Sequence, residues 1–576
     1  MGLNYASFLL GLADSATVQS PQELEWRNRR YGLYLQDSWK VTRKLTLDYG
    51  IRWDLQGQGH EIYNRDSMFG PSVPNPSAGG LLGGVAYEGY GAGRCNCYFA
   101  KNYPYAVGPR LGFAYQLNQK TVLRGGFGVI YASLATFNSF TQSPVVGVGI
   151  NQLQFPAPSF GVAGVTLRNG LIYSPSALNN ASLSPGILPT PGTVSSPAYY
   201  IDPNANRPGR VPSFSINLQR QITKDLLVEA AYVGNRGAWE IGATGLANLN
   251  ATNPATLAAE GFNLSNPATI SLLTSTIGSA AAVAAGIKLP YPGFPTGQTV
   301  AQSLRPYPQY SSSLIPMWAP LGDNWYDSLQ SKVTQRLYHG LTAQSAFTFS
   351  KEQATGQAVN NVFDRPNQKS LVSSSQPFLF VVSFTYELPF DQFLLPGNKL
   401  YRQVVGGWRL GGLFRYGSGL PIPVPSSQGN LNSLIFQSTR MNRVPGQPLF
   451  LANVNCNCFD PTKTLVLNPK AWADVPNGTW GYSAPFYNDY RYERTPYESA
   501  NISRTFRIRE RTSLELRGEF FNIFNRVELP NPSATNPLAT TTYNSTTGLL
   551  SGGFGYINVS SIGGQRTGEL VARLSF

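Results

Sequence analysis

The sequence predicts an all-β protein built on one antiparallel, up-and-down sheet, and three observations lead to this prediction. Aromatic residues make up 12% and charged residues 13% of the 576 residues, with 58 Gly and 43 Pro. Such a composition suits strands joined by turns and irregular loops better than helices. Stretches of alternating apolar and polar residues recur along the chain, with the period of two that is typical of strands. The connections between these stretches alternate between short turns and long segments rich in Gly, Pro, Ser and Asn.

The first strand pair lies in the segment YGLYLQDSWKVTRKLTLDYGIRWD, which covers residues 31–54. Its second half places on one face the apolar residues Leu45, Leu47, Tyr49, Ile51 and Trp53. The residues between them are polar or glycine and point to the other face. The first half repeats the pattern across a short turn at residues 41–44, so the segment is predicted to be a hairpin.

The same unit recurs along the chain. The further predicted pairs cover residues 111–117 and 123–131, 214–218 and 226–232, 325–337 and 341–350, 377–390 and 406–417, and 499–508 and 512–525. The two strands at residues 377–390 and 406–417 are joined by a longer link that contains Pro396 and Gly397. A final strand, GELVARLSF, ends on Phe576. About thirteen strands are therefore expected, each with one apolar face.

Long segments separate the hairpins at residues 55–109, 133–211, 235–324, 351–376, 418–498 and 526–565. Loops of this length are uncommon in compact domains. Their strict alternation with short turns is typical of an outer-membrane β-barrel, which has short periplasmic turns and long extracellular loops. The fold class that we predict is therefore a transmembrane antiparallel up-and-down β-barrel.

A two-layer β-sandwich also has alternating strands, so the content of the two faces decides between the folds. The apolar face carries Tyr, Trp and Phe near the strand ends, as in an aromatic girdle. The polar face carries charges that suit a wet lumen, and the lumen-facing candidates are Arg52, Arg124, Glu229, Lys332, Arg409, Glu515, Arg517 and Glu519. Only Asp37 and Arg504 are expected on the apolar face, near strand ends.

The net charge of +14 raises the question of nucleic-acid binding. Lys and Arg occur singly, without a basic run or a recognisable nucleic-acid module, so no nucleic-acid partner is expected. A basic surface beside phosphate-rich headgroups of outer-membrane lipid is the simpler interpretation. No segment approaches the roughly 18 apolar residues of a membrane-spanning helix. The first 16 residues lack the basic region of a signal peptide, so the protein either stays in the cytoplasm or its beginning is missing.

The sequence contains no recognisable catalytic constellation. His60 and His339 are the two histidines, far apart in the chain, and no Walker, HExxH or GxSxG motif occurs. Neither enzymatic activity nor a cofactor is expected. The stretch DPNANRPG begins like a calcium loop at Asp202, but Ser213 stands where such a loop closes on an acidic residue, which disfavours calcium.

All four cysteines lie in two matching Cys-x-Cys motifs, and both motifs fall in predicted extracellular loops. Disulfides persist in oxidising surroundings, and they are the favoured prediction for Cys95, Cys97, Cys456 and Cys458. The three possible pairings stay open. A tetrahedral metal site formed by the same four cysteines is the less favoured alternative.

Five pieces of the sequence together resemble the Oar-like branch of TonB-dependent outer-membrane receptors. They are the first hairpin, KTVLRGGFGVIY, the DPNANRPGRVPSFSINLQRQI lead-in, LRGEFFNIFNRVELPNP and the terminal VARLSF. Their order along residues 6–576 makes the resemblance fairly specific. It implies that the terminal strand, closing on Phe576, is the signal read by the barrel-assembly machinery.

The resemblance also implies parts that this sequence does not show. Such receptors carry an N-terminal plug, often preceded by a TonB box, and plugged transporters have about 22 strands. We therefore expect residues 31–576 to be the C-terminal part of such a barrel, residues 1–30 to be a lead-in truncated upstream, and the plug to be absent.

By the same resemblance, the parent protein would be an importer located in the outer membrane, coupled to TonB through the missing N-terminal region. Its substrate is unknown. Two alternatives stay open: a surface adhesion or matrix-organising protein, and a passive pore. A TonB box upstream would favour import over both.

Overall fold

The computed structural model describes most of the chain. The described residues are 4–19, 26–57, 59–62, 64, 66–132, 152–159, 161–174, 194, 199–241, 245–357, 359–390, 406–429, 431–456 and 458–576. One 14-stranded sheet dominates them, with several two-stranded sheets beside it. Among these residues, no helix is long and apolar enough to cross a membrane.

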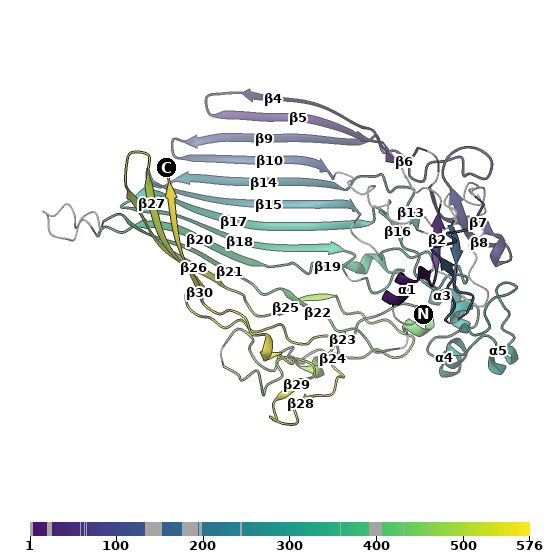
Figure 1. Cartoon of the computed structure of the whole chain (residues 1–576). Coiled ribbons are helices and arrows are strands. Elements are labelled where there is room, and N and C mark those ends of the chain that lie inside the picture. The colour runs from purple at the N-terminus through teal and green to yellow at the C-terminus, as the bar shows by residue number, and fades with distance from the viewer. Residues whose placement is uncertain are drawn as a thin grey trace.

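Thirteen strands of the large sheet follow one another in chain order, and all neighbours are antiparallel (Figure 1). They are β4 (Arg30–Lys40), β5 (Leu45–Gln56), β9 (Ala106–Asn118), β10 (Thr121–Tyr131), β14 (Arg210–Gln221), β15 (Leu226–Glu240), β17 (Gly322–Tyr338), β18 (Leu341–Thr355), β20 (Phe378–Glu387), β21 (Trp408–Gly417), β26 (Tyr497–Arg507), β27 (Ser513–Phe521) and β30 (Thr567–Ser575). A short strand, β19 (Lys369–Leu371), pairs with β18. The predicted all-β, up-and-down arrangement is confirmed. The predicted link with Pro396 and Gly397 lies outside the described residues.

The short turns and the C-terminus lie at one end of the sheet, which we call the turn side, and the long loops extend from the other end, the loop side (Figure 1). Two of the turns share a sequence device. Thr42 Oγ1 accepts hydrogen bonds from the N–H groups of Lys44 and Leu45 at 3.1 and 3.0 Å. Thr223 Oγ1 does the same for Asp225 and Leu226 at 3.3 and 3.1 Å. A threonine at the start of each turn therefore satisfies the backbone donors that lead into the next strand.

Smaller elements occupy the N-terminal segment and the long loops. The helical ones are α1 (Asn4–Leu9), η1 (Pro76–Ala78), α3 (Pro254–Ala259), α4 (Pro267–Thr274), α5 (Ala280–Ala284), α6 (Val300–Ser303), η3 (Arg365–Gln368), α8 (Leu431–Ile435), η4 (Pro469–Ala471) and η5 (Val559–Ser561). The short strands are β1 (Leu12–Ala13), β2 (Ala16–Gln19), β3 (Trp26–Arg27), β6 (His60–Glu61), β7 (Ser67–Asn75), β8 (Leu81–Tyr87), β11 (Gln152–Phe155), β12 (Val165–Thr166), β13 (Tyr200–Ile201), β16 (Pro316–Met317), β22 (Pro421–Pro423), β23 (Asn442–Arg443), β24 (Trp472–Ala473), β25 (Phe486–Arg491), β28 (Thr542–Tyr543) and β29 (Leu550–Gly552).

The buried hydrophobic clusters lie mainly in the long loops. One cluster joins the loop between β15 and β17, the loop between β21 and β26, and η1 from the loop between β5 and β9. We call it the loop cap, and its buried members are Ala78, Leu257, Leu264, Leu273, Ile277, Ala282, Tyr291, Phe294, Val300, Ala301, Leu431, Leu434 and Ile435. A second cluster fills the loop between β21 and β26 and reaches the loop before β30. The long loops are therefore packed structures with cores of their own.

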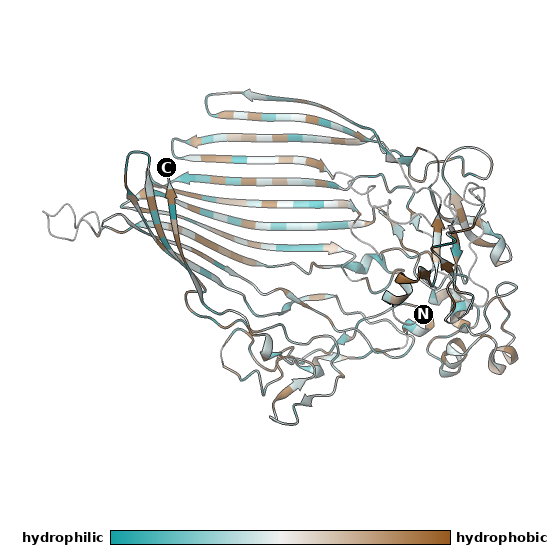
Figure 2. Cartoon of the chain, in the orientation of Figure 1, coloured by the Kyte–Doolittle hydropathy of each residue, from teal (hydrophilic) through white to brown (hydrophobic). Residues whose placement is uncertain are grey.

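Hydropathy alternates along the strands of the large sheet (Figure 2). The register places the apolar residues of successive strands opposite one another, as in Leu47 opposite Phe113 and Leu123 opposite Tyr115. One face of the sheet is therefore apolar and the other polar, and we use these names below. Each strand fits this division because side chains alternate across a strand.

The expectation that only Asp37 and Arg504 break the apolar face is wrong. Asp37 does lie there and accepts a hydrogen bond from the Tyr49 hydroxyl at 2.9 Å, and Arg504 lies over the Phe506 ring at 4.5 Å. Further charged residues share this face toward the loop side, among them Arg236, Asp327, Lys351 and Glu498. Arg236, Lys351 and Glu498 lie beyond the ends of the predicted strands. Asp327 lies inside the predicted strand at residues 325–337, so its charge on the apolar face was overlooked.

Candidate functional site

The polar face gathers all eight residues that were predicted to face a lumen. Register connects them strand by strand: Arg124 lies opposite Asn217, Glu229 opposite Lys332, and Ser503 opposite Arg517. Intervening pairs place the others on the same face, namely Arg52, Arg409, Glu515 and Glu519. That this face encloses a lumen stays a proposal.

Several of these charges are held by ion pairs along the polar face. Arg52 Nε lies 2.7 Å from Asp54 Oδ2, and Arg517 Nε lies 2.7 Å from Glu519 Oε1. Arg409 reaches Glu387 on the next strand at 3.3 Å. Most of these side chains stay partly exposed, so each pair contributes only about 0–1 kcal/mol to stability. Their effect is to fix where the charges stand on the face.

A pocket of about 350 Å³ opens at the loop side of β4 and β5. Its polar-face lining includes Arg30, Gly32, Arg52 and Asp54, and its loop-derived lining includes Tyr103, Asn206 and Pro208. The absence of a side chain at Gly32 leaves space for the ion pair of Arg52 and Asp54, because a Cβ there would lie 3.1 Å from both Arg52 Nη2 and Asp54 Oδ1.

An arginine–aromatic stack borders this pocket. The guanidinium of Arg207 lies 3.3 Å from the centre of the Trp239 ring, and that of Arg210 lies 4.4 Å from it. Tyr103 completes the stack, with its ring centre 5.9 Å from that of Trp239. Stacked guanidinium groups of this kind keep a positive charge beside an aromatic surface.

Two features mark the stack as unusual. Trp239 has φ of +64°, a left-handed conformation that a bulky residue rarely adopts and that is often associated with function. The Nε atoms of Arg207 and Arg210 are buried and lack a hydrogen-bond partner. A buried N–H group without a partner is costly, so an acceptor on a ligand would stabilise it. The stack therefore has the chemistry of an anion-binding site.

The stretch at 202–209 contributes Arg207 to the stack and Asn206 and Pro208 to the pocket lining. The Asp202 carboxylate accepts the N–H of Asn204 at 2.7 Å, which is an Asx turn. Asn206 is buried and donates its side-chain amide to the Gln56 carbonyl at 2.9 Å. These contacts explain the Asp and Asn spacing as turn chemistry.

A buried arginine, Arg305, connects two of the loops that form the loop cap. Arg305 donates from Nη1 to the Ser311 carbonyl at 2.8 Å and from Nη2 to the Ser312 carbonyl at 3.0 Å. Its guanidinium lies 4.3 Å from the ring centre of Phe436, which belongs to a different loop. Burial lowers the pKa of Arg305 to about 10, so it stays charged at neutral pH.

The loop between β5 and β9 contains buried acids. Burial is the main cause that raises the pKa of Asp66 to about 7 and that of Glu88 to about 8, and the negative charge of Asp66 adds to the shift at Glu88. Asp66 Oδ2 and Glu88 Oε2 are buried without a hydrogen-bond partner. Within the described part of the chain, no group of three or more His, Cys, Asp or Glu residues is placed to hold a metal ion.

The structure joins each cysteine pair within its own motif. Cys95 pairs with Cys97, and Cys456 pairs with Cys458, with Cα atoms 5.1 and 5.2 Å apart. Both motifs lie in long loops, as expected. Whether these bonds form at the cell surface stays a prediction.

The sequence matches the family described as "Outer membrane beta barrel domain" over residues 2–568. The chain belongs to this family. The outer-membrane β-barrel family places the protein in the outer membrane, and the apolar face of the large sheet agrees with that location. No curated protein matches the sequence.

Solved structures with a similar chain course are outer-membrane receptors and transporters. The ferric-catecholate import receptor Fiu from K12 E. coli has a TM-score of 0.37 and 11% identity, with 96% of this chain and 45% of that chain covered. The ferripyoverdine receptor of Pseudomonas aeruginosa has a TM-score of 0.38 and 10% identity, with 96% of this chain and 39% of that chain covered. The ferric citrate transporter FecA has a TM-score of 0.37 and 10% identity, with 95% of this chain and 45% of that chain covered. The chain thus spans less than half the length of these three proteins.

Sequence reasoning found the polar-face charges but missed the arginine–aromatic stack. The sequence pattern assigns Arg207 and Arg210 to a strand lead-in and Trp239 to a long loop. A usable signal was present, because two arginines three residues apart stand at the start of one strand, and the next strand has a tryptophan just before its last residue. Recognising it would have required the pairing of β14 with β15.

Proposed function

We propose that this chain is the barrel portion of an outer-membrane transporter that takes up a solute with energy delivered through TonB. The family supports a location in the outer membrane, and the resemblance of five motifs to TonB-dependent receptors supports energy-coupled uptake. In this proposal, the polar face lines the lumen, and the plug and TonB box belong to a region upstream of this sequence. The structures of Fiu and FecA are named as an import receptor and a transporter, in agreement with this class.

The observation that carries the proposal is the arginine–aromatic stack beside the pocket at the loop side of β4 and β5. A passive pore needs a water-filled lumen, but it does not need buried N–H groups that lack a hydrogen-bond acceptor. Arg207 and Arg210 supply such donors at the edge of the pocket. We infer that the solute is anionic and is captured here before it enters the lumen.

The test uses the full-length protein in its own outer membrane. Strains with the wild-type gene, a deletion, or the double change R207Q/R210Q are grown in complex medium, and solutes removed from the medium are measured by mass spectrometry. The expected result is an anionic solute that the wild type depletes and the other two strains leave behind. Deletion of TonB should abolish the same depletion.

Other outcomes would contradict the proposal. Depletion that persists without TonB would indicate a passive pore. A deletion strain that depletes every solute normally but loses surface adhesion would indicate an adhesin. Because R207Q/R210Q removes two stacked cations, its level in the outer membrane is measured alongside transport. The control K288Q removes an exposed loop cation and should leave depletion unchanged.

We also propose that Phe576 is read by the barrel-assembly machinery. Phe576 follows directly after β30 and is 96% exposed, so its side chain contributes little to packing within this chain. The change F576A should therefore lower the amount of protein in the outer membrane several-fold, as measured by immunoblot of membrane fractions. An unchanged amount would show that the residue only fills the aromatic girdle.

A further inference from the structure

A charged cluster lies on the apolar face at the loop side of three neighbouring strands. Strands β15, β17 and β18 contain 15, 17 and 15 residues. About 9–11 residues suffice for a tilted strand to cross the hydrocarbon layer. Since the turn sides of these strands are level, their loop-side ends extend beyond the apolar layer into the headgroup region.

Along the apolar face of these three strands, the residues change from apolar to charged at the same distance from the turn side. Toward the turn side, Val228 lies opposite Val333, and Leu329 lies opposite Phe349. One step further, Asp327 lies between Gly234 and Lys351, and Arg236 lies opposite Trp325. The change therefore falls on all three strands together, as expected where a barrel passes from acyl chains to headgroups.

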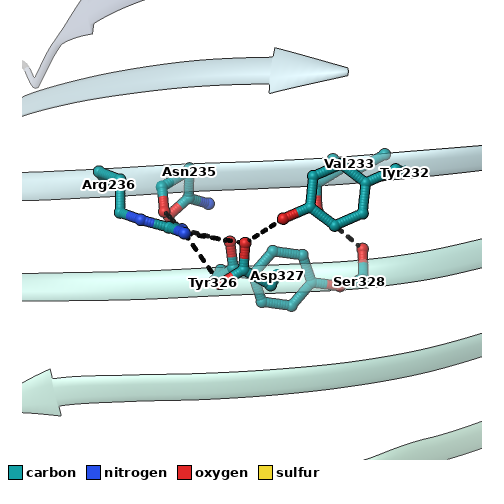
Figure 3. A network of polar contacts seen from close by, with 7 residues as sticks. All are labelled: Tyr232, Val233, Asn235, Arg236, Tyr326, Asp327 and Ser328. Carbon is teal, nitrogen blue, oxygen red and sulfur yellow. Dashed lines mark hydrogen bonds and ion pairs between the residues drawn. The ribbon is translucent and has the colours of Figure 1, made fainter. Parts of the chain in front are cut away.

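Asp327 organises the cluster (Figure 3). Its carboxylate accepts two hydrogen bonds from Arg236 Nη2, at 2.9 and 3.0 Å, and one from the Tyr232 hydroxyl at 2.5 Å. Arg236 Nη1 also donates to the backbone carbonyls of Asn235 and Tyr326, at 2.7 and 3.0 Å. Arg236 is therefore fixed in position, and its charge is balanced by Asp327.

Two lysines add positive charge that this pair does not balance. Lys351 lies directly opposite Asp327 in register and is exposed. Lys369, on β19, is exposed and places its ammonium group 3.7 Å from the centre of the Trp325 ring. Arg236, Lys351 and Lys369 carry three positive charges on this face, and the acids there are Asp327 and Asp323, which lies opposite Ala238 and next to Thr355, the partner of Lys369, so the cluster carries a net charge of +1. An aromatic girdle alone needs no such excess.

We propose that this cluster binds the phosphorylated headgroup of an anionic lipid of the outer leaflet. Lys351 and Lys369 contact the phosphate, and Arg236 supports them from its fixed position. Leu329 and Phe349, both about half exposed, lie one step toward the membrane centre, where the acyl chains of the same lipid would pack. A ligand with an anionic head and apolar chains fits both levels, which a soluble anion does not.

The test compares binding of lipids by the full chain, extracted in mild detergent. The probes are a bisphosphorylated lipid A, its monophosphorylated form and zwitterionic phosphatidylethanolamine, and bound lipid is measured by native mass spectrometry. Affinity should fall in that order. The change K351Q/K369Q should weaken binding of the bisphosphorylated lipid about 25-fold, since each lysine near such a surface contributes roughly fivefold.

The matched control is K120Q/K224Q, which removes two exposed lysines from turns at the opposite end of the sheet. It should leave lipid A binding unchanged. Heat-modifiable mobility on gels shows whether each variant is folded. Equal loss in both double variants, equal binding of phosphatidylethanolamine, or full competition by millimolar inorganic phosphate would each overturn the proposal.

Discussion

The buried acids of the loop between β5 and β9 make its stability depend on pH. Glu88 is 1% exposed, and burial raises its pKa to about 8, while burial raises that of Asp66 to about 7. Both values lie above those of the unfolded chain, so the native loop binds more protons than the unfolded one between about pH 4 and 8. The stabilisation is complete at the acid end of this window and is lost as pH rises through it.

The size of the effect follows from the shifts. A rise of about three units in one carboxyl corresponds to about 4 kcal/mol, at about 1.36 kcal/mol per unit. The two groups interact, because the charge of Asp66 contributes to the shift at Glu88, so their contributions do not add. A loss of about 2–4 kcal/mol between pH 5 and pH 9 is therefore expected.

Hydrogen exchange of the protein in membrane vesicles measures this loss. Peptides from residues 66–99, corrected for intrinsic exchange rates, should lose about 30- to 1,000-fold in protection from pH 5 to pH 9. The double change D66N/E88Q should make the protection nearly independent of pH. The control E260Q, an exposed acid in another loop, should keep the wild-type profile. Protection that rises with pH, or an unaltered profile in D66N/E88Q, would refute the reasoning.

Three further predictions concern the loops. Mass spectrometry of non-reduced peptides from intact cells should show each Cys-x-Cys pair linked within its motif; free thiols with stoichiometric zinc would support the metal alternative instead. Proteases added outside cells should cut within long loops and spare the turn at residues 41–44, and cleavage there would contradict the topology. The change G478A should cost several kcal/mol, because Gly478 has φ of +74° and a Cβ there would meet the Leu264 carbonyl. G446A, at φ of +77° in open space, should cost only about 1–2 kcal/mol, as measured by local hydrogen exchange.

The strands could be predicted from the sequence because each carries its own period-two pattern. The turn at residues 41–44 is predicted from the alternation on either side of it, and Thr42 provides the observed hydrogen bonds there. Such signals need no knowledge of distant partners. The same holds for the polar-face charges, whose side follows from counting along one strand.

The helices of the long loops were missed although a local signal exists. The sequence NPAT occurs twice, and in both copies the asparagine side chain accepts the N–H of the alanine, Ala255 at 3.0 Å and Ala268 at 2.9 Å. An asparagine cap followed by proline in the first turn is a standard helix start. The loop cap itself could not be predicted, because its core joins residues from three loops far apart in the sequence.

The charges on the two faces of the sheet are controlled by different physical conditions. On the polar face, ion pairs such as Arg52 with Asp54 stand in a wet environment, where pairing positions a charge but contributes little energy. On the apolar face, a charge at mid-bilayer would cost about 2–4 kcal/mol and near the interface about 0–1 kcal/mol. The charges found there accordingly lie toward strand ends and are satisfied locally, as Glu498 is by Arg526 at 2.8 Å. A charge on this face that exceeds such local pairing, as at Lys351 and Lys369, therefore calls for a partner from the membrane itself.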